Sequence, residues 1–148
     1  HVLRAEKGFI IVGQDTDGSV TPQDAGMSWI VNDNKNFIGK RSLSRSDMLR
    51  KDRKQLVGLR GHNPNEILPE GSQITEESGN ERPKPMIGHI TSSYYSATLG
   101  HSIALALIQS GRSRLGEDIF VFGPDDRCSK ATISDPIFYD SSGARQHV

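Results

Sequence analysis

The sequence predicts a mainly β protein whose C-terminal part forms a small antiparallel barrel or sandwich. From residue 55 onward, short apolar runs alternate with turn residues at spacings of roughly 10–15 residues, which is typical of such folds. The composition agrees, because 34% hydrophobic residues with 15 Gly and 7 Pro suit a turn-rich β protein better than a helix bundle. At 148 residues the chain can bury one modest core, or one domain and a piece of another.

Several segments after residue 55 have the length and residue pattern of strands. The Ala and Leu residues of segment 102–108 also suit a helix, but the strand-like segment before it and Gly111 after it favour β structure. The polar stretch 76–85 predicts an exposed hairpin loop. Cys128 falls on the last strand and is expected to be a small buried residue. The expected strands cover residues 56–59, 73–75, 86–92, 102–108, 118–122 and 128–134.

The part of the chain before residue 55 is less regular. The apolar run 9–12 predicts a strand or a helix end packed in a core. Thr21 followed by Pro22 predicts a short helical turn, because Pro suits the first helical position. The charged run 45–54 predicts a solvated helix face or a linker, and we expect the domain boundary there.

Charge and cysteine content exclude several classes of function. Lys+Arg and Asp+Glu both number 18, so no net charge attracts nucleic acid or an anionic membrane. A single cysteine excludes an internal disulfide, and the five His have no ligand-like spacing, so we expect no metal site. No run approaches the roughly 20 apolar residues that span a bilayer, and no signal peptide is visible. We therefore expect a soluble, cytoplasmic protein that binds neither nucleic acid nor membranes.

Glu6 is the main candidate for a binding residue. A carboxylate set among apolar residues must be solvated or must accept hydrogen bonds, because burying it bare costs several kcal/mol. Glu6 is therefore either the partner of Arg4 or Lys7, or an acceptor for donors on a ligand.

Two other pairs of residues have a structural explanation. Asp15 and Asp17 suggest a carboxylate pair, but a turn closed by Gly18 explains them as well. Tyr94 and Tyr95 are adjacent in an expected strand, so their rings point to opposite faces and at most one of them lines a pocket.

Four short motifs follow one another in the N-terminal part. Residues 3–8 read Leu-Arg-Ala-Glu-Lys-Gly, residues 13–15 Gly-Gln-Asp, residues 21–22 Thr-Pro, and residues 26–29 Gly-Met-Ser-Trp. This order resembles the glycine-cleavage T-protein (aminomethyltransferase) family, whose signature reads Leu-Arg-x-Glu-x-Gly, Gly-x-Asp, Thr-x-Pro and Ser-x-Trp.

The second half resembles the same family, with Gly-x-x-Thr-Ser ending at Ser92 and an Asp-Pro-Ile-Phe tail ending at Phe138. The resemblance implies a C-terminal barrel domain of about six or seven antiparallel strands over residues 55–140. It implies that residues 1–48 are an α+β C-terminal fragment of the folate-binding domain. It also implies a helix over residues 37–51.

The resemblance also implies the site residues. In the family, the glutamate at the position of Glu6 binds the pterin ring of tetrahydrofolate, and a carboxylate can accept two parallel N–H bonds from such a ring edge. Lys35 lies where the family has a cationic residue that meets the folate tail; the alternative is an exposed surface lysine. The family's catalytic aspartate lies upstream of His1, so no catalytic residue is assigned here.

Within the family, the Ser-Ser-Tyr-Tyr-Ser stretch at 92–96 and the tail after Phe138 resemble the C-terminal end of the α subunit of heterotetrameric sarcosine oxidases. This implies oxidative demethylation of sarcosine to glycine and hydrogen peroxide, with transfer of the one-carbon unit to tetrahydrofolate. Flavin and NAD would bind elsewhere in the parent complex, and the other subunits would be partners. The chain would support the folate site and be inactive alone. The alternatives are a non-enzymatic subunit-docking barrel, or a piece of an aminomethyltransferase or dimethylglycine dehydrogenase.

Overall fold

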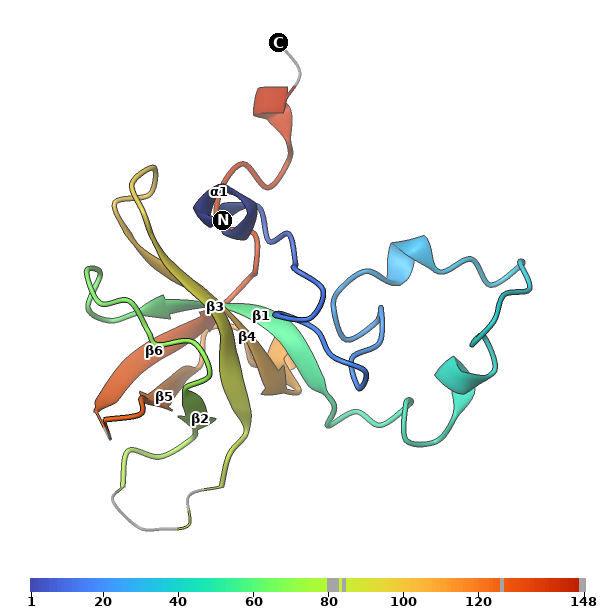
Figure 1. The fold of residues 1–148 in the computed structure, drawn as a ribbon, viewed down its shortest axis with the longest axis horizontal. Coiled ribbons are helices and arrows are strands. Elements are labelled where there is room, and N and C mark those ends of the chain that lie inside the picture. Colours follow the sequence, from blue (N-terminus) through green and yellow to red (C-terminus); the bar gives the residue numbers. More distant parts are fainter. Residues whose placement is uncertain (80–82, 84, 126, 147–148) are drawn as a thin grey trace.

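A closed antiparallel β-barrel dominates the computed structural model, which describes residues 1–79, 83, 85–125 and 127–146 (Figure 1). The strands of this described part pair in the closed order β1-β4-β3-β2-β5-β6. The predicted barrel is confirmed, and its strand number lies within the expected range. The strands are β1 (Lys54–Gly61), β2 (Gln73–Thr75), β3 (Gly88–Ser96), β4 (His101–Gln109), β5 (Asp118–Phe122) and β6 (Cys128–Ser134).

Helices are few and short in the described residues. One α-helix, α1 (Val2–Glu6), begins the chain and lies beside the C-terminal tail (Figure 1). Before the barrel, the described backbone has one isolated bridge, between Val12 and Thr16, and no strand. The 3₁₀ helices are η1 (Ser28–Ile30), η2 (Ser42–Ser44), η3 (Gly111–Arg114) and η4 (Ala144–Gln146).

The prediction of a helix over residues 37–51 is wrong. The structure has turns and only the three-residue η2 in this range, within a segment that loops away from the barrel (Figure 1). Ile38 and Leu49 are 104% and 67% exposed, so no packed apolar face supports a helix here. Since isolated helices shorter than about 12–15 residues are marginal in water, the segment adopts turns, with Gly39 at φ +92°.

The prediction that the run 9–12 packs in a core is also wrong in part. Phe9 and Val12 are exposed, whereas Ile10 packs partly against the outer face of the barrel. The run is a turn in which Asp15 N–H bonds back to the Ile11 carbonyl, so its side chains do not share one face.

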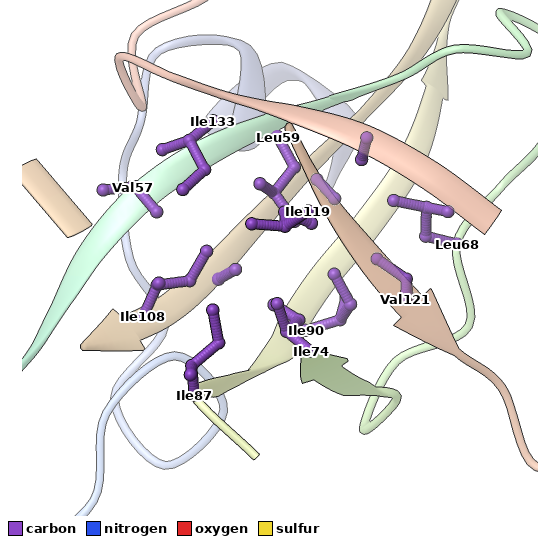
Figure 2. Close-up of a cluster of buried hydrophobic side chains, with 13 residues drawn as sticks. Val57, Leu59, Leu68, Ile74, Ile87, Ile90, Ile108, Ile119, Val121 and Ile133 are labelled. Carbon is purple, nitrogen blue, oxygen red and sulfur yellow. The ribbon is translucent and has the colours of Figure 1, made fainter. Parts of the chain in front are cut away.

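The barrel interior is filled by aliphatic side chains from every strand, together with residues of two connecting segments (Figure 2). Inward residues alternate along each strand, as the two-residue period requires. The cluster comprises Val57, Leu59, Leu68, Ile74, Ile87, Ile90, Ala104, Ala106, Ile108, Ile119, Val121, Ala131 and Ile133.

Residues 103–108 of strand β4 are all apolar because both faces of this part of the strand are buried. Ala104, Ala106 and Ile108 point into the barrel. The alternate residues form a second cluster on the outside, where α1 and the C-terminal tail cover them. This double burial explains why the run shows no polar alternation, and it confirms the prediction of a strand over a helix. The outer cluster comprises Ala5, Leu56, Ile103, Leu105, Leu107 and Phe138.

Cys128 is exposed, so its expected burial is wrong. It is the first residue of β6 and shares the outward face with Lys130, whereas Ser129 between them points inward. The two-residue period of the strand therefore decides the orientation of this thiol, against the usual preference of cysteine for burial.

The loop between β2 and β3 corresponds to the hairpin loop expected at 76–85. The two strands pair antiparallel, with Gln73 opposite His89 and Ile74 opposite Gly88. Residues 80–82 and 84 of this loop lie outside the described residues.

Candidate functional site

Helix α1 packs against the outer face of β3 through polar side chains. One guanidinium nitrogen of Arg4 donates to Ser92 Oγ at 2.6 Å and to the Tyr94 hydroxyl at 3.1 Å. Ser96 Oγ donates to Glu6 Oε1 at 2.6 Å. Ser92, Tyr94 and Ser96 are alternate residues of one strand and therefore share a face. This polar row positions α1 on the barrel.

A β-bulge in β3 brings two hydroxyls to the same point. The register passes from Ile90 opposite Ala106 to Ser92 opposite Leu105, so Thr91 is the extra residue. Thr91 Oγ1 and Ser92 Oγ both donate to Asp15 Oδ1, at 2.5 and 2.6 Å. Without the bulge, adjacent residues would point to opposite faces.

Asp15 is the centre of this buried network, a role that the turn explanation of the sequence missed. It is 0% exposed, pairs with the Arg4 guanidinium and accepts the Ile11 N–H at 2.9 Å. Burial by itself would raise the pKa of Asp15, but the hydroxyls of Ser92 and Thr91, the Ile11 N–H and Arg4 outweigh it and lower the pKa. The carboxylate is thus fully compensated.

Asp24 is a second buried and neutralised carboxylate. Arg53 donates to Asp24 from Nε and from one terminal nitrogen, at 3.0 and 2.6 Å. The Thr21 N–H and hydroxyl donate to the same Oδ2 at 2.9 and 2.8 Å. Burial would raise the pKa of Asp24, but Arg53 and Thr21 outweigh it and the pKa is lowered.

These lowered pKa values predict loss of stability in acid. A carboxyl whose pKa is lower in the folded than in the unfolded state stabilises the fold above the unfolded value, about 4, and less as pH falls below it. We expect the free energy of unfolding to decline below about pH 4. Denaturant titrations across this range should show a shallower decline for Asp15→Asn and Asp24→Asn, since each variant lacks one linked proton. An equally steep decline in both variants would contradict the assignment.

Glu6 differs from the other two buried carboxylates in the described structure. It is 3% exposed, and its side chain has one hydrogen bond, from Ser96. Neither neighbouring cation neutralises it: Arg4 pairs with Asp15, and Lys7 pairs with Asp140 at 3.2 Å. The local salt bridge considered for Glu6 is therefore not formed. Among the described residues, Glu6 is a buried carboxylate without a cationic partner.

The C-terminal tail fixes the backbone around Glu6. The Glu6 carbonyl accepts the N–H groups of Phe138 and Tyr139, both at 2.9 Å. Gly8 adopts φ +69°, and a Cβ there would lie 2.9 Å from the Pro136 carbonyl oxygen. Helix α1 is therefore held between β3 and the tail.

The other candidate residues lie in different surroundings. Lys35 is exposed, and its described hydrogen bond is the backbone N–H to the Asn32 carbonyl at 3.2 Å. It belongs to the segment that loops away from the barrel (Figure 1), and no described contact links it to Glu6. The two tyrosines point to opposite faces: Tyr94 lies under the Arg4 guanidinium, 5.6 Å from the ring centre, while Tyr95 is 44% exposed.

Glu6 does not line either of the following two clefts in the described part of the chain. The larger, about 310 Å³, lies between the segment before the barrel and strands β1, β3 and β4, with Arg50, Lys54 and His89 among its lining residues. The smaller, about 60 Å³, contains Glu66 and Ser129. The described residues include no group of His, Cys, Asp and Glu suited to hold a metal ion. No described helix is long and apolar enough to cross a membrane.

The fold and the site define a class of protein. Its members have a closed antiparallel barrel whose outer face carries a C-terminal tail and a short helix held by polar side chains. The family model described as the glycine cleavage T-protein C-terminal barrel domain matches residues 54–140. The chain belongs to this family.

Similar proteins fall into two groups. The chain is 49% identical to sarcosine oxidase subunit alpha of Corynebacterium sp. (strain P-1), over 99% of this chain and 15% of that protein. It is 34% identical to the aminomethyltransferase of Thermotoga maritima, over 98% of this chain and 37% of that protein. The chain thus spans a minor part of the length of these relatives.

A solved structure shows the same fold. The aminomethyltransferase T of the glycine cleavage system from Bartonella henselae superposes with a TM-score of 0.75 at 20% identity, covering 94% of this chain and 37% of that one. The similarity includes the part before the barrel, because the matched share exceeds the residues of the barrel alone.

Proposed function

We propose that this chain is the C-terminal part of a sarcosine oxidase α subunit and forms one side of a tetrahydrofolate site. The observation that carries the proposal is Glu6, a carboxylate at 3% exposure with one hydroxyl donor and no cation among the described residues. Burying such a charge is costly unless further donors reach it. Asp15 and Asp24 are equally buried and already paired, so they have no such requirement.

The donors that fit Glu6 are the paired N–H groups of an aminopyrimidine ring edge. A carboxylate presents about four acceptor positions, of which Ser96 uses one. Two parallel N–H bonds would compensate the charge as an Arg fork does for other carboxylates. The residues present therefore fit the pterin end of tetrahydrofolate. Lys35 stays a prediction for the folate tail.

The proposed reaction of the whole protein is oxidative demethylation of sarcosine to glycine and hydrogen peroxide. Bound tetrahydrofolate would accept the one-carbon unit. Flavin and NAD would bind in other parts of the complex, and this chain would hold no catalytic residue and be inactive alone. The identity of 49% to a sarcosine oxidase subunit, against 34% to an aminomethyltransferase, favours this branch. We further propose a cytoplasmic location and contacts with the other subunits.

The domain division is part of the proposal. We assign residues 1–48 to the folate-binding domain and residues 55–140 to the barrel. Most of the exposed large hydrophobic side chains lie before residue 50, which fits a segment that packs against further polypeptide. The second candidate function is a subunit-docking barrel, which an exposed apolar patch on the barrel itself would favour. The exposed side chains in the segment before residue 50 are Leu3, Phe9, Val12, Trp29, Ile30, Phe37, Ile38 and Leu49.

Substitution of Glu6 in the complete protein tests the folate site. We expect Glu6→Ala to weaken tetrahydrofolate binding by about 1.5–3 kcal/mol, roughly 10- to 150-fold in Kd. Glu6→Gln should weaken binding similarly, because its amide keeps an acceptor for Ser96 but presents N–H donors to the ligand's own donors. Calorimetry gives the Kd, while peroxide and formaldehyde assays follow the reaction.

The assays also separate the two functions. We expect both variants to oxidise sarcosine, which needs no folate, and to release the one-carbon unit as formaldehyde. Unchanged folate affinity together with lost sarcosine oxidation would assign Glu6 a structural role and would favour the subunit-docking barrel.

A further inference from the structure

We propose that Ser96, on the barrel, is a positioning residue that orients the Glu6 carboxylate toward its ligand. The inference rests on the proposed folate site and adds a part played by the barrel domain. Ser96 is 0% exposed and bonds to Glu6 across 90 positions of sequence. The barrel would therefore set the geometry of a binding group that the preceding segment carries.

The direction of the Ser96 hydrogen bond is fixed by its surroundings. Ser96 Oγ accepts the Leu99 N–H at 3.0 Å. A serine hydroxyl has a single proton, and a carboxylate can only accept. The proton therefore points at Glu6 Oε1, 2.6 Å away. Ser96 is an oriented donor, held by the chain rather than free to rotate.

The backbone at Ser96 is rigid. Ser96 is the last residue of β3 and pairs with His101 at the start of β4. The Gly100 N–H bonds to the Ser96 carbonyl at 2.8 Å, and Gly100 adopts φ +72°, which closes the turn between the strands. A group on such a turn is better fixed than one on a longer loop.

Fixing one carboxylate oxygen decides where the other acceptor positions point. The terminal torsion of a glutamate is broad, so an unrestrained carboxylate samples many orientations. With Oε1 held by Ser96, the second oxygen, which has no partner among the described residues, has a defined direction. A ligand with two parallel N–H donors requires a carboxylate of fixed orientation, because both donors must be aligned with its oxygens at once.

A thermodynamic cycle in the complete protein tests the inference, with tetrahydrofolate as the probe. We expect Ser96→Ala to raise the Kd about 5- to 10-fold when Glu6 is present and less than about 2-fold in the Glu6→Ala background. Ser96→Cys, which keeps the shape but offers only a weak donor, should behave like Ser96→Ala and covers the case in which the alanine variant does not fold.

The matched control is Ser102→Ala. Ser102 is 4% exposed on the neighbouring strand, and its hydroxyl has no hydrogen-bond partner among the residues that the structure describes, so its removal should leave the Kd unchanged. Unchanged affinity in Ser96→Ala, or equal weakening in both backgrounds, would overturn the role of Ser96. Unchanged affinity in Glu6→Ala itself would count instead against the folate site.

Discussion

Replacement of Asp15 by alanine is expected to cost about 3–5 kcal/mol of folding free energy. The substitution leaves the Arg4 guanidinium, 15% exposed in its side chain, without its carboxylate partner. It also leaves the hydroxyls of Thr91 and Ser92 without their common acceptor. A charge left without its partner away from water destabilises the fold by more than the intact ion pair stabilised it, so the loss of folding free energy is large. Chemical denaturation of wild type and variant measures it.

Asp17→Ala is the control for this prediction. Asp17 is exposed and its carboxylate accepts hydrogen bonds from the N–H and hydroxyl of Ser19, so we expect a loss of at most about 1 kcal/mol. If the two variants lost the same stability, the network around Asp15 would not be what attaches the N-terminal segment to the barrel. Folate binding by the complete protein should also fall in Asp15→Ala, because Arg4 and Glu6 lie on one short helix.

Replacement of Gly88 by alanine is expected to destabilise the barrel by about 3 kcal/mol. Gly88 is the first residue of β3 and pairs with both Ile74 and Ile108. An added Cβ would overlap the Leu107 carbonyl oxygen and lie 3.0 Å from Ile108 Cα. These are backbone atoms of a paired strand, so they cannot move aside as the end of a flexible side chain would.

Gly18→Ala provides the comparison, because no atom lies within 4 Å of its added Cβ. We expect a change within about 0.5 kcal/mol at this position. Denaturant unfolding of both variants under the same conditions gives the difference. A Gly88→Ala variant as stable as Gly18→Ala would mean that β3 and β4 can separate locally without loss of the core, against the close packing seen between them.

The sequence by itself determined the barrel, because strand formation depends on local patterns of apolar and turn residues. The run that became β4 was predicted correctly, since the strand-like segment before it and Gly111 after it favoured β structure over a helix. The same local reasoning failed at residues 37–51. A helix there needs a surface to pack against, and Ile38 and Leu49 have none in this structure. It failed for Cys128 because the face of a strand residue depends on register, not on its type.

The tertiary structure alone decided how the buried carboxylates are paired. Arg4 and Lys7 are the cations nearest to Glu6 in sequence, yet their ion pairs go to Asp15 and Asp140. Asp15 has as its partners two hydroxyls from the bulge in β3, more than 70 positions away. No local pattern encodes such contacts, because they arise when the closed barrel places the outer face of β3 beside α1. Whether a buried carboxylate is neutralised or left for a ligand is therefore a property of the fold.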